Sequence, residues 1–308
     1  MTSKDSRVYI QINDLVELKG KLKKFKLLNK VPLRNLLTGK FQSKVKGRGL
    51  TFEEIRDYRI GDDIRYMDWK TTLRYGKPHT RSFTEEKERP VLLFVDQGRT
   101  MFFGSHNKMK SVVACELAAI VTWLSLEQKE RVGGLTFHEK HYQSFTPGHS
   151  TNKTMEFFKV LEKFNGELGI SSQERLENRF SYYLPKLENL TTQNSLLVLI
   201  SDFYRIDDQS LSILRRLSSK NQVVALHVYD PLEHKLEDEV DFVISDGQEV
   251  AHLSKRTDSE IHRKFNSFKE SRLAQVKKKV ASFGIKFYEF NTNDDILEQF
   301  EMQVLRSK

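Results

Sequence analysis

Two acidic residues directly follow runs of apolar residues, and their positions favour ion binding or proton chemistry. Residues 91–95 read Val-Leu-Leu-Phe-Val and precede Asp96, and residues 196–200 read Leu-Leu-Val-Leu-Ile and precede Ser201 and Asp202. Such runs are typical of strands that are buried on both faces of a parallel sheet. Because ligands of open α/β sheets bind outside the carboxyl ends of the strands, we expect both acids at the edge that carries the functional site.

The turn after the first run could present several oxygen atoms to one hard cation. Alternate residues of an extended turn point the same way, so Asp96 and Thr100 can supply ligands to one site. Gly98 has no side-chain oxygen, and Arg99 places a positive charge beside the position of the cation. Mg²⁺ is therefore expected here only with a water molecule in place of the missing ligand, an arrangement that this ion accepts readily.

A second concentration of charge lies between residues 47 and 83. Its characteristic residues are Arg56, Arg59, Asp62, Asp63, Arg65, Asp68 and Trp69. One interpretation is a catalytic or metal-binding carboxylate group, and the other is a partly buried network in which guanidinium groups bind carboxylates and fix a turn against the sheet. We favour the network, because the arginines would neutralise a metal site and because Tyr58 and Trp69 supply an apolar body to pack beneath it.

Signatures of known enzyme classes are missing from the sequence. There is no nucleophile elbow, no zinc-binding helix motif and no glycine-rich phosphate loop, and residues 47–50 lack the Lys-Ser/Thr that such a loop needs. His138 and His141 form the closest histidine pair, with His149 beyond, which leaves a metal hydrolase unsupported. The sharpest enzymatic alternative is a divalent-metal-dependent phosphodiesterase that uses the acids named above on a nucleic acid.

The residues named above must be positioned by strands and helices that alternate along the chain. This alternation predicts an α/β fold with a doubly wound, mostly parallel sheet. Further strands are expected at residues 131–137, 141–145, 222–229 and 285–290, with a small hairpin over residues 240–253. Helices are expected at residues 105–128, 152–164, 173–190, 209–219 and 261–283, with a last helix from Asp294. Thr292 is the expected cap of that last helix, and His227 is expected to be a core histidine.

The positive charge of the chain is concentrated in its amino-terminal part. The chain carries a net charge of +9, and residues 18–52 contain eleven basic residues, no acidic residue and several interleaved leucines. Residues 19–48 could lie on an anionic membrane surface, or the segment could form a helix docked on the main domain with its lysines in water. We favour docking, because Pro32 breaks the pattern. Nucleic-acid binding is not expected, because no aromatic platform for bases accompanies the charge.

Cysteine usage and hydropathy indicate a cytoplasmic protein. The chain has one cysteine, Cys115, which we expect to be an inert buried thiol, and this usage fits a reducing compartment. Residues 1–10 contain three charged side chains and no apolar run, so no secretory signal is expected. No stretch approaches the roughly 20 apolar residues that a membrane span needs.

The motif region resembles a known bacterial family. Gly61-Asp62-Asp63-Ile64-Arg65 is followed by Met67-Asp68-Trp69 and then by Asp96 at the end of an apolar strand. This order resembles the family called "domain of unknown function 58", over about residues 47–305. The resemblance implies a von Willebrand factor A-like domain with a Rossmann-like three-layer fold. It also implies partnership with a MoxR-type AAA+ ATPase in the assembly or maturation of other proteins, in the cytoplasm or at the periphery of the inner membrane.

The resemblance further implies a metal-ion-dependent adhesion site. Von Willebrand factor A-like domains bind a divalent cation through an Asp-x-Ser-x-Ser turn, a threonine from a second loop and an aspartate from a third. Here the matching positions are Asp96 and Thr100 in the turn, Thr151 in the second loop and Asp202 in the third, with Mg²⁺ as the implied cofactor. Thr151 has a second interpretation, as a cap of the helix over residues 152–164.

Two functions from different classes remain open. In the first, the chain is a non-enzymatic protein-interaction module. Its carboxyl edge, by which we mean the side of the sheet where the parallel strands end, binds an acidic side chain of a client or of the AAA+ partner. In the second, it is the metal-dependent phosphodiesterase described above. We expect three parts: a basic amphipathic segment over residues 1–46, the motif region over residues 47–90, packed on the main domain, and the von Willebrand factor A-like domain over residues 91–308.

Overall fold

The chain divides into two compact units. One combines Met1–Gly39 with Arg89–Lys308, and the other is Lys40–Glu88. The computed structural model describes residues 5–24, 51–84, 90–139, 141–169, 179–234, 242–245, 250–253 and 272–305. The start of the chain therefore belongs to the same unit as the main domain.

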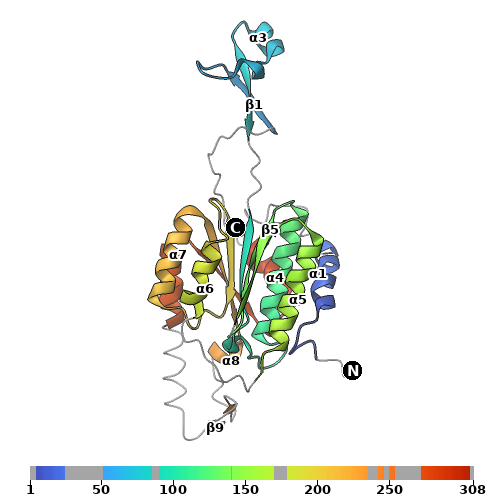
Figure 1. Cartoon of the computed structure of the whole chain (residues 1–308), viewed down its shortest axis with the longest axis vertical. Helices are drawn as coiled ribbons and strands as arrows, with labels where there is room; N and C mark the ends of the chain where they lie inside the picture. The colour runs from blue at the N-terminus through green and yellow to red at the C-terminus, as the bar shows by residue number, and fades with distance from the viewer. Residues whose placement is uncertain are drawn as a thin grey trace. The chain divides into compact units, whose positions relative to one another are not determined.

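The larger unit is built on a six-stranded sheet with the order β10-β7-β6-β3-β4-β5 (Figure 1). Its strands are β3 Val91–Asp96, β4 Val132–Phe137, β5 Tyr142–Gly148, β6 Leu196–Ser201, β7 Gln222–Tyr229 and β10 Lys286–Asn291. Neighbouring strands are parallel except for β5, which runs antiparallel to β4. The expected doubly wound, mostly parallel sheet is confirmed at the level of a mixed α/β fold with helices on both faces.

The order of the strands creates a switch point beside β3. The chain passes from β3 to β4 on one side and later returns to β6 on the other side of β3. The register pairs Val95 with Ile200, so β3 and β6 end at the same edge. In such sheets the crevice outside the carboxyl ends at the switch point is the usual ligand site.

Helices cover both faces of the sheet (Figure 1). The helices of this unit are α1 Ile12–Lys24, α4 Lys110–Glu127, α5 Thr151–Gly166, α6 Arg179–Glu188, α7 Asp208–Lys220, α8 Pro231–His234 and α10 Ile296–Phe300, which η4 Glu301–Leu305 follows. Helices α1, α4, α5 and α10 share one apolar core. Helices α6 and α7 share the other with a helical stretch over residues 272–282, so the sheet is the middle of three layers.

Helix α4 is buried around almost its whole circumference. All residues from Lys110 to Ser125 are buried, including Cys115, whose pKa is raised by burial and then by the neighbouring Glu116. A helix that is apolar all round needs cover on its outer side. Helix α1 supplies that cover through Leu15, Leu18 and Leu22. The Trp123 indole N–H donates to the Leu15 carbonyl oxygen at 2.8 Å.

These contacts bear out docking for the described part of the basic segment. The side chains of Lys19, Lys21 and Lys23 are exposed to water, while the leucines between them are buried. The rest of the segment, residues 25–50, lies outside the described residues, as do most of the residues expected at an anionic surface.

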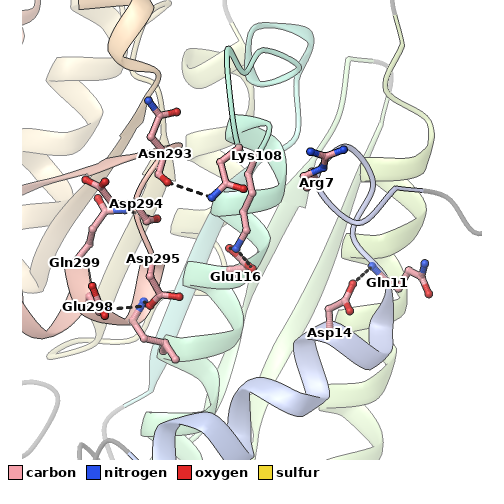
Figure 2. Close-up of polar contacts among 12 residues, drawn as sticks. Arg7, Gln11, Asp14, Lys108, Glu116, Asn293, Asp294, Asp295, Glu298 and Gln299 are labelled. Carbon is pink, nitrogen blue, oxygen red and sulfur yellow. Dashed lines mark hydrogen bonds and ion pairs between the residues drawn. The ribbon is translucent and has the colours of Figure 1, made fainter.

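Polar contacts connect the start of α4 to the carboxyl-terminal part of the unit (Figure 2). The Asn107 side-chain amide donates to the Asn293 carbonyl oxygen at 3.1 Å. Near it, the Lys108 ammonium binds the Glu116 carboxylate at 2.7 Å, and Asp295 caps α10 by accepting from two backbone N–H groups. Thr292, the expected cap, is buried and donates its hydroxyl to Asp230 instead. The cap lies three residues later because Asp295 precedes the first helical turn, whereas the strand end keeps Thr292 inside the unit.

The smaller unit contains an antiparallel pair of strands and one short helix. Strand β1 Thr51–Asp57 pairs with β2 His79–Thr84, and between them lie η2 Ile64–Tyr66 and α3 Trp69–Tyr75. Asp68 caps α3 by accepting from the Thr71 N–H, and Gly76 ends the helix with φ of 67°, in the left-handed region. The motif residues are therefore positioned by two caps and a hairpin.

Two further observations complete the fold. The expected small hairpin is present as β8 Phe242–Ser245 and β9 Val250–Leu253. Among the residues that the structure describes, no helix has both the length and the apolar character needed to cross a bilayer.

Candidate functional site

Asp96 and Asp202 leave adjacent strands at the same edge of the sheet. Asp96 is 1% exposed, and its carboxylate accepts from the Gly98 N–H at 2.8 Å and from the Ser201 hydroxyl at 2.7 Å. Asp202 accepts from the Tyr204 N–H at 3.0 Å. Ser201 therefore links the turn after β3 to the turn after β6, as the two apolar runs predicted.

A buried lysine supplies the positive charge at this edge. Lys110 is the first residue of α4, its side chain is 1% exposed, and its ammonium lies 3.0 Å from Asp202 and 2.9 Å from Glu233. Burial by itself would lower the pKa of Lys110, but the two carboxylates outweigh burial and raise this pKa above its ordinary value. The ammonium is therefore a fixed internal cation held between β6 and α8.

A small pocket opens beside this ion cluster. It has a volume of about 60 Å³ and lies against Lys110, Asp202, Phe203, Tyr204, His227, Tyr229, Glu233, Arg272, Leu273 and Val276. His227 stacks on Tyr229 with ring centres 5.6 Å apart, and the Arg272 guanidinium lies 5.7 Å from the centre of the Tyr204 ring. The pocket therefore combines an aromatic wall with two positive and two negative groups, and its size suits one or two waters or a small polar group.

The expected Mg²⁺ ligands do not come together as one set. Thr151 begins α5, just after β5, and β5 pairs its last residue, Gly148, with the first residue of β4. Asp96 pairs with the last residue of β4, at the carboxyl ends of the parallel strands. Thr151 therefore lies at the other side of the sheet, where these strands begin. The prediction for Thr151 therefore fails in the structure, since the antiparallel direction of β5 carries the following helix start away from the carboxyl edge.

The remaining donors fit a fixed ammonium better than a divalent cation. Asp202 is already paired with Lys110, and Gly98 offers no side-chain oxygen. Thr100 lies half-buried in the short helical turn Arg99–Met101, and the Arg99 N–H donates to the Glu139 carboxylate at 2.6 Å. A Mg²⁺ ion beside Lys110 would have to overcome a buried like charge, so this residue set does not fit the ion.

In the smaller unit, the three motif aspartates are bound by arginines and backbone N–H groups. Asp62 accepts from both terminal nitrogens of Arg56 at 2.8 Å and from the Arg59 N–H at 2.9 Å. These bonds, that of Arg56 first, lower the pKa of Asp62. Asp63 pairs with Arg65 at 2.7 Å. The arrangement agrees with the predicted network of guanidinium groups and carboxylates.

Asp68 is the best-buried member of this network. It is 5% exposed, caps α3 through the Thr71 N–H, and accepts from Arg81 at 2.8 Å. The Thr71 N–H, followed by Arg81, lowers the pKa of Asp68 to about 2. The carboxylate is thus kept ionised as a structural acceptor for the cap and the hairpin.

Trp69 does not pack beneath the network as expected. It is 62% exposed, and Leu73, one turn later on α3, is 83% exposed. Further apolar side chains of this unit, Ile60, Ile64 and Tyr75, are also exposed. We call these five residues the motif surface. The expectation failed because Asp68 as the cap fixes the start of α3 and turns the next residue, Trp69, toward water.

Residues 54–275 match the family described as "Protein of unknown function DUF58". The chain belongs to this family. The DUF58 match spans both units, because it begins within β1 and ends beyond the pocket residue Arg272.

Comparison with other sequences and with solved structures finds several similar proteins. Uncharacterized proteins of Mycobacterium bovis and Mycobacterium tuberculosis are 25% identical over 232 residues, which cover 75% of this chain and 71% of theirs. The crystal structure of a conserved hypothetical protein, BatB, from Bacteroides thetaiotaomicron aligns with a TM-score of 0.42 and 11% identity, covering 70% of this chain and 95% of that chain. An aerotolerance-related membrane protein from Bacteroides fragilis gives 0.40 and 13%, covering 71% and 99%.

Sequence reasoning missed several residues of the DUF58 carboxyl edge. Lys110, Glu233 and Asp230 received no role, although Asp230 is fully buried and accepts from the Ser105 N–H at 2.8 Å. Burial would raise the pKa of Asp230, but hydrogen bonds from Thr292 and Ser105 outweigh it and lower this pKa. No local signal marked Lys110, because the helix was expected to begin at residue 105 and not at Lys110, where α4 begins.

Proposed function

We propose that this DUF58 protein is a non-enzymatic protein-interaction module with a von Willebrand factor A-like main domain. The observation that carries the proposal is the motif surface. Five large apolar side chains are exposed within this short unit, two of them one turn apart on α3, and separate ion pairs at Asp62, Asp63 and Asp68 fix the turns that carry them. The motif carboxylates bind arginines, which leaves recognition to the apolar side chains around them.

The proposed partner is a MoxR-type AAA+ ATPase that acts with this chain in the assembly or maturation of a client protein. The chemistry of the motif surface indicates what the partner must offer. Exposed basic side chains lie next to the apolar ones in the sequence: Lys70 and Arg74 are exposed on α3, and the Arg65 side chain is 85% exposed. The matching partner surface is therefore an apolar pocket with an acidic rim.

Binding measurements with the purified partner test this proposal. We expect the full chain to bind the ATPase in one nucleotide state, and Trp69→Ala and Leu73→Ser each to weaken binding roughly ten-fold or more, as for an interface anchor. Tyr182→Ala is the matched control, because Tyr182 is an aromatic residue of α6 that is 54% exposed, compared with 62% for Trp69. Unchanged affinity of both motif variants would exclude the motif surface, and a lack of binding in every nucleotide state would exclude the partner.

At the carboxyl edge, we propose that the Lys110 ammonium takes the place that the resemblance assigns to Mg²⁺. The edge would then bind polar groups of a client without a divalent cation. The metal-dependent phosphodiesterase is less well supported, because Asp62, Asp63 and Asp68 bind arginines and Asp202 binds Lys110. Nuclease assays with Mg²⁺ and Mn²⁺ test it directly, and metal-dependent turnover lost in Asp96→Ala would replace the interaction proposal.

We propose a cytoplasmic protein in which α1 stays docked through its leucines while the basic side chains of residues 19–48 contact the anionic surface of the inner membrane. The exposed Lys19, Lys21 and Lys23 on the outer side of α1 support this placement. Association with anionic vesicles should weaken steeply as salt concentration rises, because the attraction is screened within about a Debye length. Association that does not respond to salt would remove this role.

A further inference from the structure

Two histidines and a glutamate meet at the end of the β4–β5 hairpin. His138 and His141 flank the turn between the two strands, and Glu167 directly follows α5. One ligand atom from each residue lies within 4.8 Å of the other two. The closest pair is His141 Nε2 and Glu167 Oε2, which are 3.3 Å apart.

These distances match the requirements of a small tetrahedral ion. Zinc binds histidine nitrogen and carboxylate oxygen at about 2.0–2.2 Å, so two ligands of a tetrahedral site are roughly 3.4 Å apart. His141 and Glu167 already have this separation, and the ligand nitrogen of His138, which lies within 4.8 Å of both ligand atoms, has to move closer when the ion binds. We propose that His138, His141 and Glu167 form a Zn²⁺ site with one open coordination position.

The surroundings support this geometry. His138 is 4% exposed, and the ring centres of both histidines lie near that of Phe164, at 6.1 Å for His138 and 4.9 Å for His141. Phe164 thus lies beside both rings, near the end of α5 that Glu167 follows. The positive group that faces Glu167 is Lys163, at 3.9 Å from Oε1, whereas Oε2 faces His141.

The site lies beside the carboxyl edge and is reachable from water. The Gln97 N–H donates to the Phe137 carbonyl oxygen, which joins the turn after Asp96 to the end of β4. The side chains of His141 and Glu167 are 47% and 36% exposed. A bound Zn²⁺ would tie the hairpin to the end of α5, and its open position would accept a water molecule or a carboxylate from another molecule. The motif surface plays no part in this site.

Titration of the full chain with Zn²⁺, and with Co²⁺ as a spectroscopic probe, tests the site. We expect one equivalent of Zn²⁺ to bind, Co²⁺ to give the strong visible absorption of a tetrahedral complex, and Mg²⁺ not to compete, because imidazole suits zinc and hard cations take oxygen ligands. His141→Ala and Glu167→Gln should each weaken Zn²⁺ binding by roughly ten-fold or more, since each removes one of three ligands.

Matched variants separate this site from adventitious binding and from a simple ion pair. His149→Ala removes an exposed histidine at the far end of β5 and should leave Zn²⁺ affinity unchanged. Glu167→Gln keeps the shape of an exposed side chain, so circular dichroism should show a folded protein. The proposal is overturned if the wild type binds no stoichiometric Zn²⁺, or if His141→Ala and Glu167→Gln bind it as tightly as the wild type.

Discussion

Replacing Lys110 by methionine tests whether the buried ammonium stabilises the carboxyl edge. Methionine keeps much of the apolar stem but leaves Asp202 and Glu233 facing each other without their cation. The side chains of these acids are only 6% and 22% exposed, so water replaces the lost contact poorly. Removing one partner of a buried ion pair costs about 3–5 kcal/mol. In a domain of this size, that loss corresponds to a fall in Tm of roughly 6–20 °C.

Urea unfolding followed by circular dichroism measures this loss. Lys279→Met is the matched control, because Lys279 is 55% exposed and pairs with Asp208 at 2.9 Å, so its loss should cost less than about 1 kcal/mol. Because the pKa of Lys110 is raised, its contribution is complete below the ordinary value of 10.5 and is lost as the pH rises further. A loss below about 1 kcal/mol for Lys110→Met at neutral pH would refute the reasoning.

Three further predictions concern pH, backbone packing and metal. The His227 imidazole, 3.7 Å from the Glu289 carboxylate, and then the Lys277 ammonium at 2.6 Å lower the pKa of Glu289 to about 2. The contribution of Glu289 to stability is therefore complete above its ordinary pKa of 4.5 and is lost as the pH falls toward 2. Glu289→Gln should flatten the pH dependence of the unfolding free energy between pH 2 and pH 4.5. An unchanged slope would mean that other carboxylates cause this pH dependence. Gly134→Ala should lower the free energy of unfolding in urea by about 3 kcal/mol or more, because φ of Gly134 is +143° and the new Cβ would lie 2.1 Å from the Leu93 carbonyl oxygen. The control is Gly20→Ala in α1, whose new Cβ meets nothing within 4 Å and should raise the free energy of unfolding by roughly 0.5–1 kcal/mol. Millimolar Mg²⁺ should leave the Tm of the wild type unchanged relative to a NaCl solution of equal ionic strength, and a specific rise would restore the divalent-cation site.

The sheet and its functional edge could be predicted because they depend on local signals. The runs before Asp96 and Asp202 are long, apolar and β-branched, and parallel strands bring their carboxyl ends to one edge whatever the connections. The small hairpin could be predicted for the same reason, because Asp246-Gly247 is a strong turn signal between two short apolar runs. Helix ends were less certain, as Thr292 shows, since a threonine before a helix can serve either as a cap or as a buried donor.

The remaining parts of the site depend on long-range packing. Lys110 stands in a stretch with Lys108 and Asn107 that reads as a surface segment, and only the crossing of α4 over β6 and β7 buries it. Thr151 was misplaced because the direction of β5 decides to which edge the following helix start belongs. Trp69 was assigned to the interior on its size alone, whereas the cap at Asp68 determines where its side chain points.

The docking of α1 on α4 sets practical limits on how the larger unit can be produced and handled. A fragment that begins after residue 24 would uncover Trp123 and the leucine contacts that α1 makes, on a helix whose residues are otherwise sheltered. Such a fragment should self-associate through the uncovered face of α4. After a protease cuts between α1 and β3, the larger unit should stay in solution only while α1 remains bound to α4.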